Sequence, residues 1–94
     1  MDKKEAKSIL SEIIEFYREK DFLELKEFID SEPDTGETVG KSGEKYQYEI
    51  QAFWDDSACG NIRIIGSIDN GGWRAFKPIS DDFIKNINND FVGE

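Results

Sequence analysis

Few side chains in this chain could do chemistry, and histidine is not among them. The 94-residue sequence has no histidine and one cysteine, Cys59. Without imidazole, Ser-His-Asp and Cys-His nucleophile pairs, histidine general bases and nearly all catalytic zinc sites are excluded. Cys59 falls beside an expected turn and not at a helix start, so we expect a packing cysteine without a reactive thiol.

Paired carboxylates remain as acid-base candidates, at Asp55-Asp56 and Asp81-Asp82. Each pair has a structural explanation, because aspartate is common in turns and in the first turn of a helix. A glycosidase-like pair of carboxyl groups also needs a deep cleft, which a chain of this size hardly encloses. We therefore expect a protein that is not an enzyme.

The sequence also does not match two common ligand-binding motifs, the phosphate loop and the calcium loop. The glycines at 36–43 have no GxxxxGK[ST] pattern, so a nucleotide site is not indicated. Counted as a calcium loop from Asp30, the sixth position is Thr35 instead of glycine and the twelfth is Lys41 instead of an acid. We expect no cofactor and no metal.

The charge is strongly acidic, with 12 Lys and Arg against 21 Asp and Glu, a net charge of −9. Such a chain repels phosphate backbones and anionic membrane surfaces, so neither nucleic acid nor membrane is the expected partner. No apolar run approaches the roughly 20 residues that cross a bilayer. The single cysteine and the absence of a signal-like start point to the cytoplasm.

The first half of the chain predicts two helices and a loop. Apolar residues recur every three or four positions over 3–19, and a new stripe over 22–29 follows Asp21, a suitable N-cap with Glu24 three positions on. The segment 30–45 is acidic and rich in glycine, so we expect it to be a flexible loop.

Strands are expected in the second half. Residues 46–54 and 61–69 alternate between apolar and polar side chains. The Asn-Gly pair at 70–71 indicates a two-residue hairpin turn, which would pair Ile68 with Trp73 in a third strand.

The end of the chain predicts a helix. Pro78 would end the third strand, and Ser80 with two following aspartates is typical of a helix start. Gly66 leaves a thin spot in the sheet, where a bulge or a closely packed helix fits. The expected fold is α+β, a single domain over 1–94 with two N-terminal helices, a three-stranded antiparallel meander and a short C-terminal helix.

Two features exceed the needs of folding: the acidity of residues 30–56, and a second apolar sheet face with Phe53, Ile65 and Phe76. Acidity can steer a basic partner, and exposed apolar faces or sheet edges can pair with a second copy. We therefore expect a protein-interaction domain, either a homodimer or a binder of a basic protein. The expected partner-binding residues are Glu37, Glu44, Tyr46, Tyr48, Trp54, Asp55 and Asp56.

In size, charge and composition the chain is similar to bacterial immunity proteins that neutralise toxins. This resemblance implies one basic protein partner, such as a nuclease. It involves no sequence motif and assigns no residue.

A small-ligand pocket between helices and sheet is the alternative. Tyr17, Tyr48, Trp54 and Trp73 would line it. Arg63 and Arg74 would then hold an anionic group of the ligand, although surface carboxylates could equally pair with both arginines.

Overall fold

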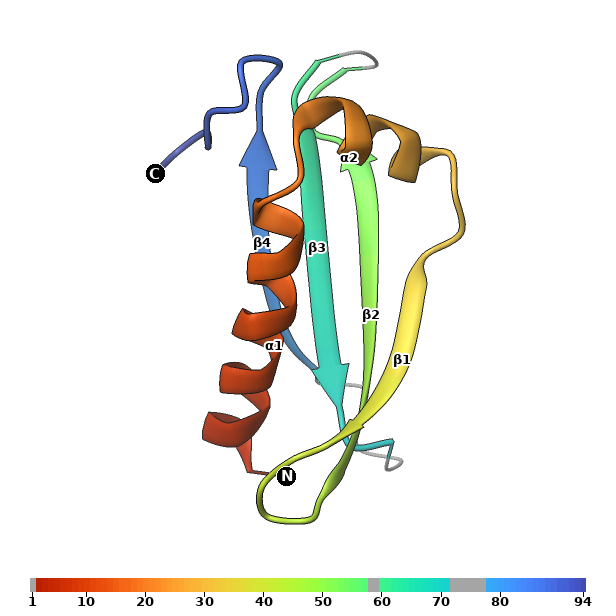
Figure 1. Ribbon diagram of the computed structural model, residues 1–94, viewed down its shortest axis with the longest axis vertical. Coiled ribbons are helices and arrows are strands. Elements are labelled where there is room, and N and C mark those ends of the chain that lie inside the picture. The colour runs from red at the N-terminus through yellow and green to blue at the C-terminus, as the bar shows by residue number, and fades with distance from the viewer. Residues whose placement is uncertain (1, 58–59, 72–77) are drawn as a thin grey trace.

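The computed structural model describes residues 2–57, 60–71 and 78–94. Two helices, α1 (Lys3–Arg18) and α2 (Phe22–Ile29), precede four strands, β1 (Asp34–Val39), β2 (Lys45–Trp54), β3 (Ile62–Asp69) and β4 (Ile79–Lys85). The strands form one antiparallel sheet in the order β1-β2-β3-β4. Both helices pack on the same face of this sheet (Figure 1). The fold is α+β as predicted, but the described residues contain one strand more and one helix fewer than expected.

Both predicted N-terminal helices are confirmed. The side chain of Asp2 accepts a hydrogen bond of 3.0 Å from the N–H of Glu5, and Asp21 accepts one of 2.9 Å from the N–H of Glu24. These aspartates satisfy backbone donors that have no partner inside the first turn of a helix.

The prediction of a flexible loop over residues 30–45 is wrong, because this segment contains β1. All six residues of β1 pair with β2. An edge strand has one neighbour and buries little apolar surface, so a polar composition does not prevent it from pairing.

The turn between β1 and β2 spans residues 40–44 and is closed by two backbone hydrogen bonds. The N–H of Gly40 donates to the carbonyl of Glu44 at 2.9 Å, and the N–H of Gly43 donates to the carbonyl of Gly40 at 2.9 Å. Gly43 has a φ of 88°, a left-handed conformation that glycine adopts without a steric cost.

The predicted C-terminal helix is also wrong. Residues 79–85 form β4, in which Phe83 and Lys85 are buried and the residues between and beside them are more exposed. The Ser-Asp-Asp signal at residues 80–82 is local, whereas β3 carries a row of buried isoleucines whose backbone needs a strand on each side. Pairing with β3 therefore overrides the capping signal.

The predicted two-residue hairpin after β3 is wrong as well. Ile68 pairs with Ile79 in β4 and with Tyr48 in β2, so both positions beside it are occupied. The third strand expected around Trp73 lies outside the described residues. Gly71 does take a positive φ, 74°, and its N–H donates to the side chain of Asp69 at 2.7 Å.

The core lies between the helices and the sheet. Its buried members from α1 and α2 are Ala6, Leu10, Ile14, Tyr17, Phe22 and Leu25, and those from the sheet are Tyr46, Ile50, Ile62, Ile64, Ile68 and Phe83. The thin spot predicted at Gly66 is confirmed as the place where α1 approaches the sheet closely. A β-carbon on Gly66 would lie 2.7 Å from Cδ1 of Ile14 and 3.1 Å from Cδ1 of Leu10.

Candidate interaction surface

The sheet face opposite the helices is left open by the described elements. α1 lies on β3 and β4, and α2 lies on β2 and β3, all on the core side (Figure 1). Because side chains alternate along a strand, every second residue of β2 and β3 points to the open face. These side chains are half-buried or exposed, whereas those of Ile62, Ile64 and Ile68 are fully buried.

Three carboxylates gather on this face, in a shallow depression that we call the acidic hollow. Strand register aligns Glu37 of β1 with Gln47 of β2 and Asp69 of β3, and the adjacent row contains Glu49. The hollow has a volume of about 320 Å³. Its lining residues are Thr35, Gly36, Glu37, Gln47, Tyr48, Glu49, Ser67 and Asp69.

No cation from the described part of the chain neutralises these three carboxylates. Glu49 accepts a hydrogen bond from the amide of Gln51, and Asp69 accepts one from the N–H of Gly71. The ion pairs among the described residues lie elsewhere. The acidic hollow therefore presents three like charges and a few neutral hydrogen-bonding groups to solvent, an arrangement that favours a positively charged ligand.

The rest of the open face differs in character, because its charges are paired. Arg63 forms two 2.9 Å contacts with Asp55, from Nε and from Nη2, and a further ion pair with Asp82. Hydrogen bonding to Asp55 raises the pKa of Arg63. Phe53, which is exposed, and Ile65, which is half-buried, share this part of the face. Phe76, expected beside them, lies outside the described residues.

The predicted acidic partner residues are spread over the molecule. Glu37 lies in the acidic hollow, and Glu44 lies in the β1–β2 turn. Asp55 is held by Arg63 beyond the other end of β2, next to the exposed Asp56. The structure therefore brings one of these four carboxylates into the acidic hollow.

The predicted aromatic anchors point to the helix-covered face. Tyr46 is 1% exposed, and its hydroxyl donates to the carboxylate of Glu5 at 2.8 Å. Tyr48 and Trp54 are half-buried, and the ring of Trp54 lies 6.5 Å from that of Phe22. These three side chains are packing residues, and none of them presents a freely exposed ring.

The residues predicted to line a small-ligand pocket are not collected in one place. Tyr17 is buried, stacks on Phe28 at 5.8 Å and donates a hydrogen bond to Asp34. Trp54 lines a different hollow, and Arg63 lies on the opposite face of the sheet. Trp73 and Arg74 lie outside the described residues.

Glu49 counted toward the acidic segment 30–56 but was not assigned to the expected partner-binding set, and Asp69 was not singled out at all. The alternation of β2 already separates Glu49 from the core-facing side chains, but its neighbours depend on strand register. Without β1 in the sheet, the row from Glu37 to Asp69 could not be deduced.

Within the described residues, no three acidic or cysteine side chains lie close enough together to hold a metal ion, and no helix is long and apolar enough to span a membrane. Comparison with models of protein families, with curated proteins and with solved structures finds no match to this chain.

Proposed function

We propose that this chain is a non-enzymatic interaction domain that binds a basic protein partner at the acidic hollow. The observation that carries the proposal is the meeting of Glu37, Glu49 and Asp69 from three adjacent strands, with no cation of the described chain against them. Like charges that line one hollow repel one another, and a cationic partner relieves this repulsion.

A basic partner is favoured over a second copy by charge. Each chain has a net charge of −9, so two copies repel at long range, whereas a basic protein is attracted. The homodimer is the competing outcome. Light scattering over a tenfold concentration range decides it, because a stable mass near twice 10.8 kDa would place a self-interface on this protein.

We expect no catalysis, because the sequence has no histidine and Asp55, one of the paired carboxylates, is bound by Arg63. The resemblance to toxin-neutralising immunity proteins suggests what kind of protein the partner is. The partner would then be a basic toxin domain whose activity is blocked on binding.

The small-ligand alternative has less support. Its expected lining residues are divided between two faces of the sheet, and the interior between helices and sheet is filled by fully buried side chains such as Leu10, Leu25 and Ile50.

The test begins with the purified protein as bait in a lysate of the source cells, followed by purification of the captured partner and measurement of the association rate. Charge reversal by Glu37→Lys with Glu49→Lys should slow association by about tenfold or more at low ionic strength, with a smaller effect at high salt. Glu19→Lys with Asp90→Lys makes the same change of net charge and is the control, because both residues are exposed and neither lines the acidic hollow. An association rate that responds equally to both changes would contradict the proposed site.

A further inference from the structure

No strand of residues 2–57, 60–71 and 78–94 pairs with the outer edge of β1. In the described part of the chain β1 has a strand neighbour on one side, β2, and it forms the edge of the sheet away from α1 (Figure 1). Such an edge presents a row of backbone N–H and C=O groups without strand partners.

The other edge of the sheet is covered at one end. After β4 the chain turns back, so that the N–H of Val92 donates to the carbonyl of Ile84 at 2.9 Å and Phe91 forms a β-bridge with Lys85. Backbone groups at this end of β4 therefore already have hydrogen-bond partners.

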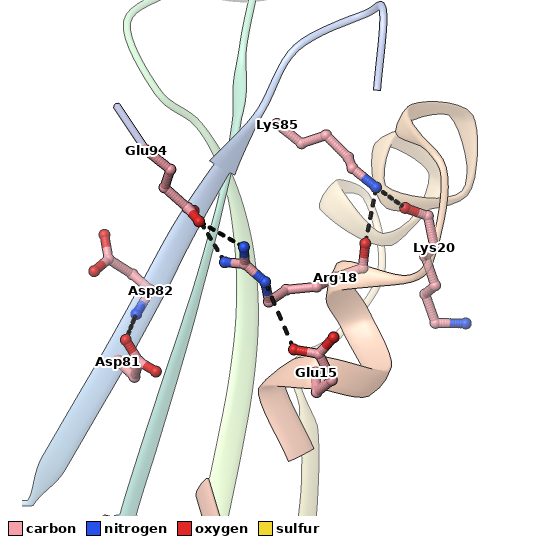
Figure 2. Close-up of polar contacts among 7 residues, drawn as sticks. All are labelled: Glu15, Arg18, Lys20, Asp81, Asp82, Lys85 and Glu94. Carbon is pink, nitrogen blue, oxygen red and sulfur yellow. Dashed lines mark hydrogen bonds and ion pairs between the residues drawn. The ribbon is translucent and has the colours of Figure 1, made fainter. Parts of the chain in front are cut away.

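Arg18 of α1 holds this returning segment, and Lys85 joins the end of β4 to the end of α1 beside it. Arg18 binds both carboxylate oxygens of Glu94, at 2.6 and 2.9 Å, and its guanidinium carbon lies 3.9 Å from the centre of the Phe91 ring. Lys85 reaches from β4 to the carbonyls of Arg18 and Lys20, as Figure 2 shows. No described segment covers the outer edge of β1 in this way.

The hydrogen-bond pattern identifies which groups of β1 face outward. Bonded and non-bonded pairs alternate in an antiparallel ladder, and the N–H of Gly40 is bonded to Glu44 at the turn. Counting back in steps of two, Thr38 and Gly36 bond to β2. Thr35, Glu37 and Val39 therefore direct their N–H and C=O groups away from the sheet.

Hollows flank β1 on both faces, so side chains of an added strand have room. The acidic hollow lies on the open face. On the helix side, a hollow of about 330 Å³ is lined by Tyr17, Lys20, Glu24, Glu27 and Asp34, among others. A second helix-side hollow of about 500 Å³ lies between α1 and the far end of β1.

The acidic side chains of β1 indicate what kind of strand would pair with its open edge. Edge strands are often protected by lysine, but β1 has no basic residue and carries Asp34 and Glu37, both exposed. Two copies of β1 would bring these carboxylates together, whereas lysine or arginine side chains on an added strand would meet them with opposite charge.

We propose that β1 receives an extended basic segment of the partner as a fifth strand of the sheet. This inference rests on the proposed function and specifies how the partner is recognised. Main-chain hydrogen bonds along the edge supply affinity, and the flanking carboxylates select basic side chains at alternate positions.

The probe for strand addition is a synthetic peptide of four Lys-Thr repeats with blocked ends, titrated into the full chain and followed by NMR. The expected result is slower hydrogen exchange at the amides of Thr35, Glu37 and Val39, with little change at Gly36 and Thr38. A peptide of equal charge, N-methylated at alternate residues, should bind at least about tenfold more weakly, because it loses several N–H donors and one hydrogen bond alone is worth up to about tenfold. Equal binding of both peptides would overturn strand addition and leave the acidic hollow as a charged contact site.

Variants of Thr35 test the same inference against the captured partner. Thr35→Pro removes an outward N–H without changing charge and should weaken binding by about tenfold, whereas Thr35→Val keeps the N–H and should bind like the wild type. Equal affinity of the two variants would overturn strand addition. If the proline variant does not fold, the N-methylated peptide still decides the question on the wild-type protein. Loss of binding on charge reversal, together with no effect of Thr35→Pro, would leave the proposed function standing and remove this inference alone.

Discussion

The carboxylate of Glu5, in the first turn of α1, binds Ser42 in the β1–β2 turn twice, accepting from its backbone N–H at 3.1 Å and from its hydroxyl at 2.7 Å. Tyr46 donates a third hydrogen bond to the same carboxylate. One acidic side chain therefore joins the start of α1 to the hairpin that carries the β1 edge.

Replacing Glu5 should lower the stability of the protein, by an amount that depends on pH. Hydrogen bonds from Ser42 and Tyr46 lower the pKa of Glu5 below its ordinary value of 4.5. A lowered carboxyl pKa adds stability that is present above the unfolded value and lost as pH falls through the folded value. Glu5→Gln should therefore be less stable than the wild type at neutral pH, and the difference should shrink well below pH 4.5. Urea unfolding at both pH values measures it.

Glu12→Gln is the control for Glu5, because Glu12 is exposed on the same helix. Glu12→Gln should change the midpoint of urea unfolding little at either pH. A stability difference for Glu5→Gln that persists in acid would contradict the assigned role of the carboxylate.

Gly66→Ala should destabilise the protein through overpacking. The new β-carbon would meet Ile14, Ile50 and Leu10 at 2.7 to 3.1 Å, inside the contact between α1 and β3. Core overpacking costs about 1–3 kcal/mol. The free energy of unfolding in urea measures this cost. Ser67→Ala, the next residue and on the open face, should stay within about 0.5 kcal/mol of the wild type, and equal effects of the two changes would contradict close packing at Gly66.

The sequence predicted α1, α2, β2 and β3 correctly, because their apolar patterns and helix caps are local features of the chain. The helices follow from apolar stripes and from Asp21, whose side chain caps α2 as expected. β2 and β3 follow from alternation. β1 and β4 were missed because they form by pairing. β1 is polar, and β4 contains the Ser-Asp-Asp sequence at 80–82 that is typical of a helix start.

The candidate site was predicted only in part, because the sequence shows which segments are acidic but not how the strands pair. The acidity of residues 30–56 is visible in the composition, and both Glu37 and Glu49 belong to this segment. Which carboxylates meet depends on register, and register needs both neighbours of β2. The aromatic residues were assigned to a partner surface because alternation separates two faces without saying which one the helices cover.

Lys85→Met should remove a polar link between β4 and the end of α1. The ammonium of Lys85 donates to the carbonyls of Arg18 and Lys20, at 2.9 and 2.6 Å, while its side chain is buried. Leaving these acceptors without a donor should cost about 1–3 kcal/mol at neutral pH. Lys7→Met, an exposed lysine of α1, is the matched control and should have little effect in urea unfolding.

The same lysine gives a prediction at alkaline pH. Burial is the main cause that lowers the pKa of Lys85 below 10.5, so the unfolded chain binds more protons between the lowered value and 10.5. The wild type should therefore gain stability relative to Lys85→Met as pH rises through that window. A constant difference between the two proteins would contradict the lowered pKa.

Arg18→Lys should release the returning C-terminal segment while leaving most of the fold intact. Lysine keeps the charge, but it has no planar guanidinium to bind both oxygens of Glu94 while its carbon lies over the ring of Phe91, as that of Arg18 does. The amide of Val92, which donates to Ile84, should then exchange with solvent about tenfold faster, whereas core amides of β3 should keep their protection. Glu15→Gln is the control, because Glu15 lies 3.7 Å from Arg18 as an exposed ion pair and such pairs contribute little. Unchanged exchange at Val92 in Arg18→Lys would mean that the backbone contacts hold the segment without Arg18, and the cover over the end of β4 would then be independent of α1.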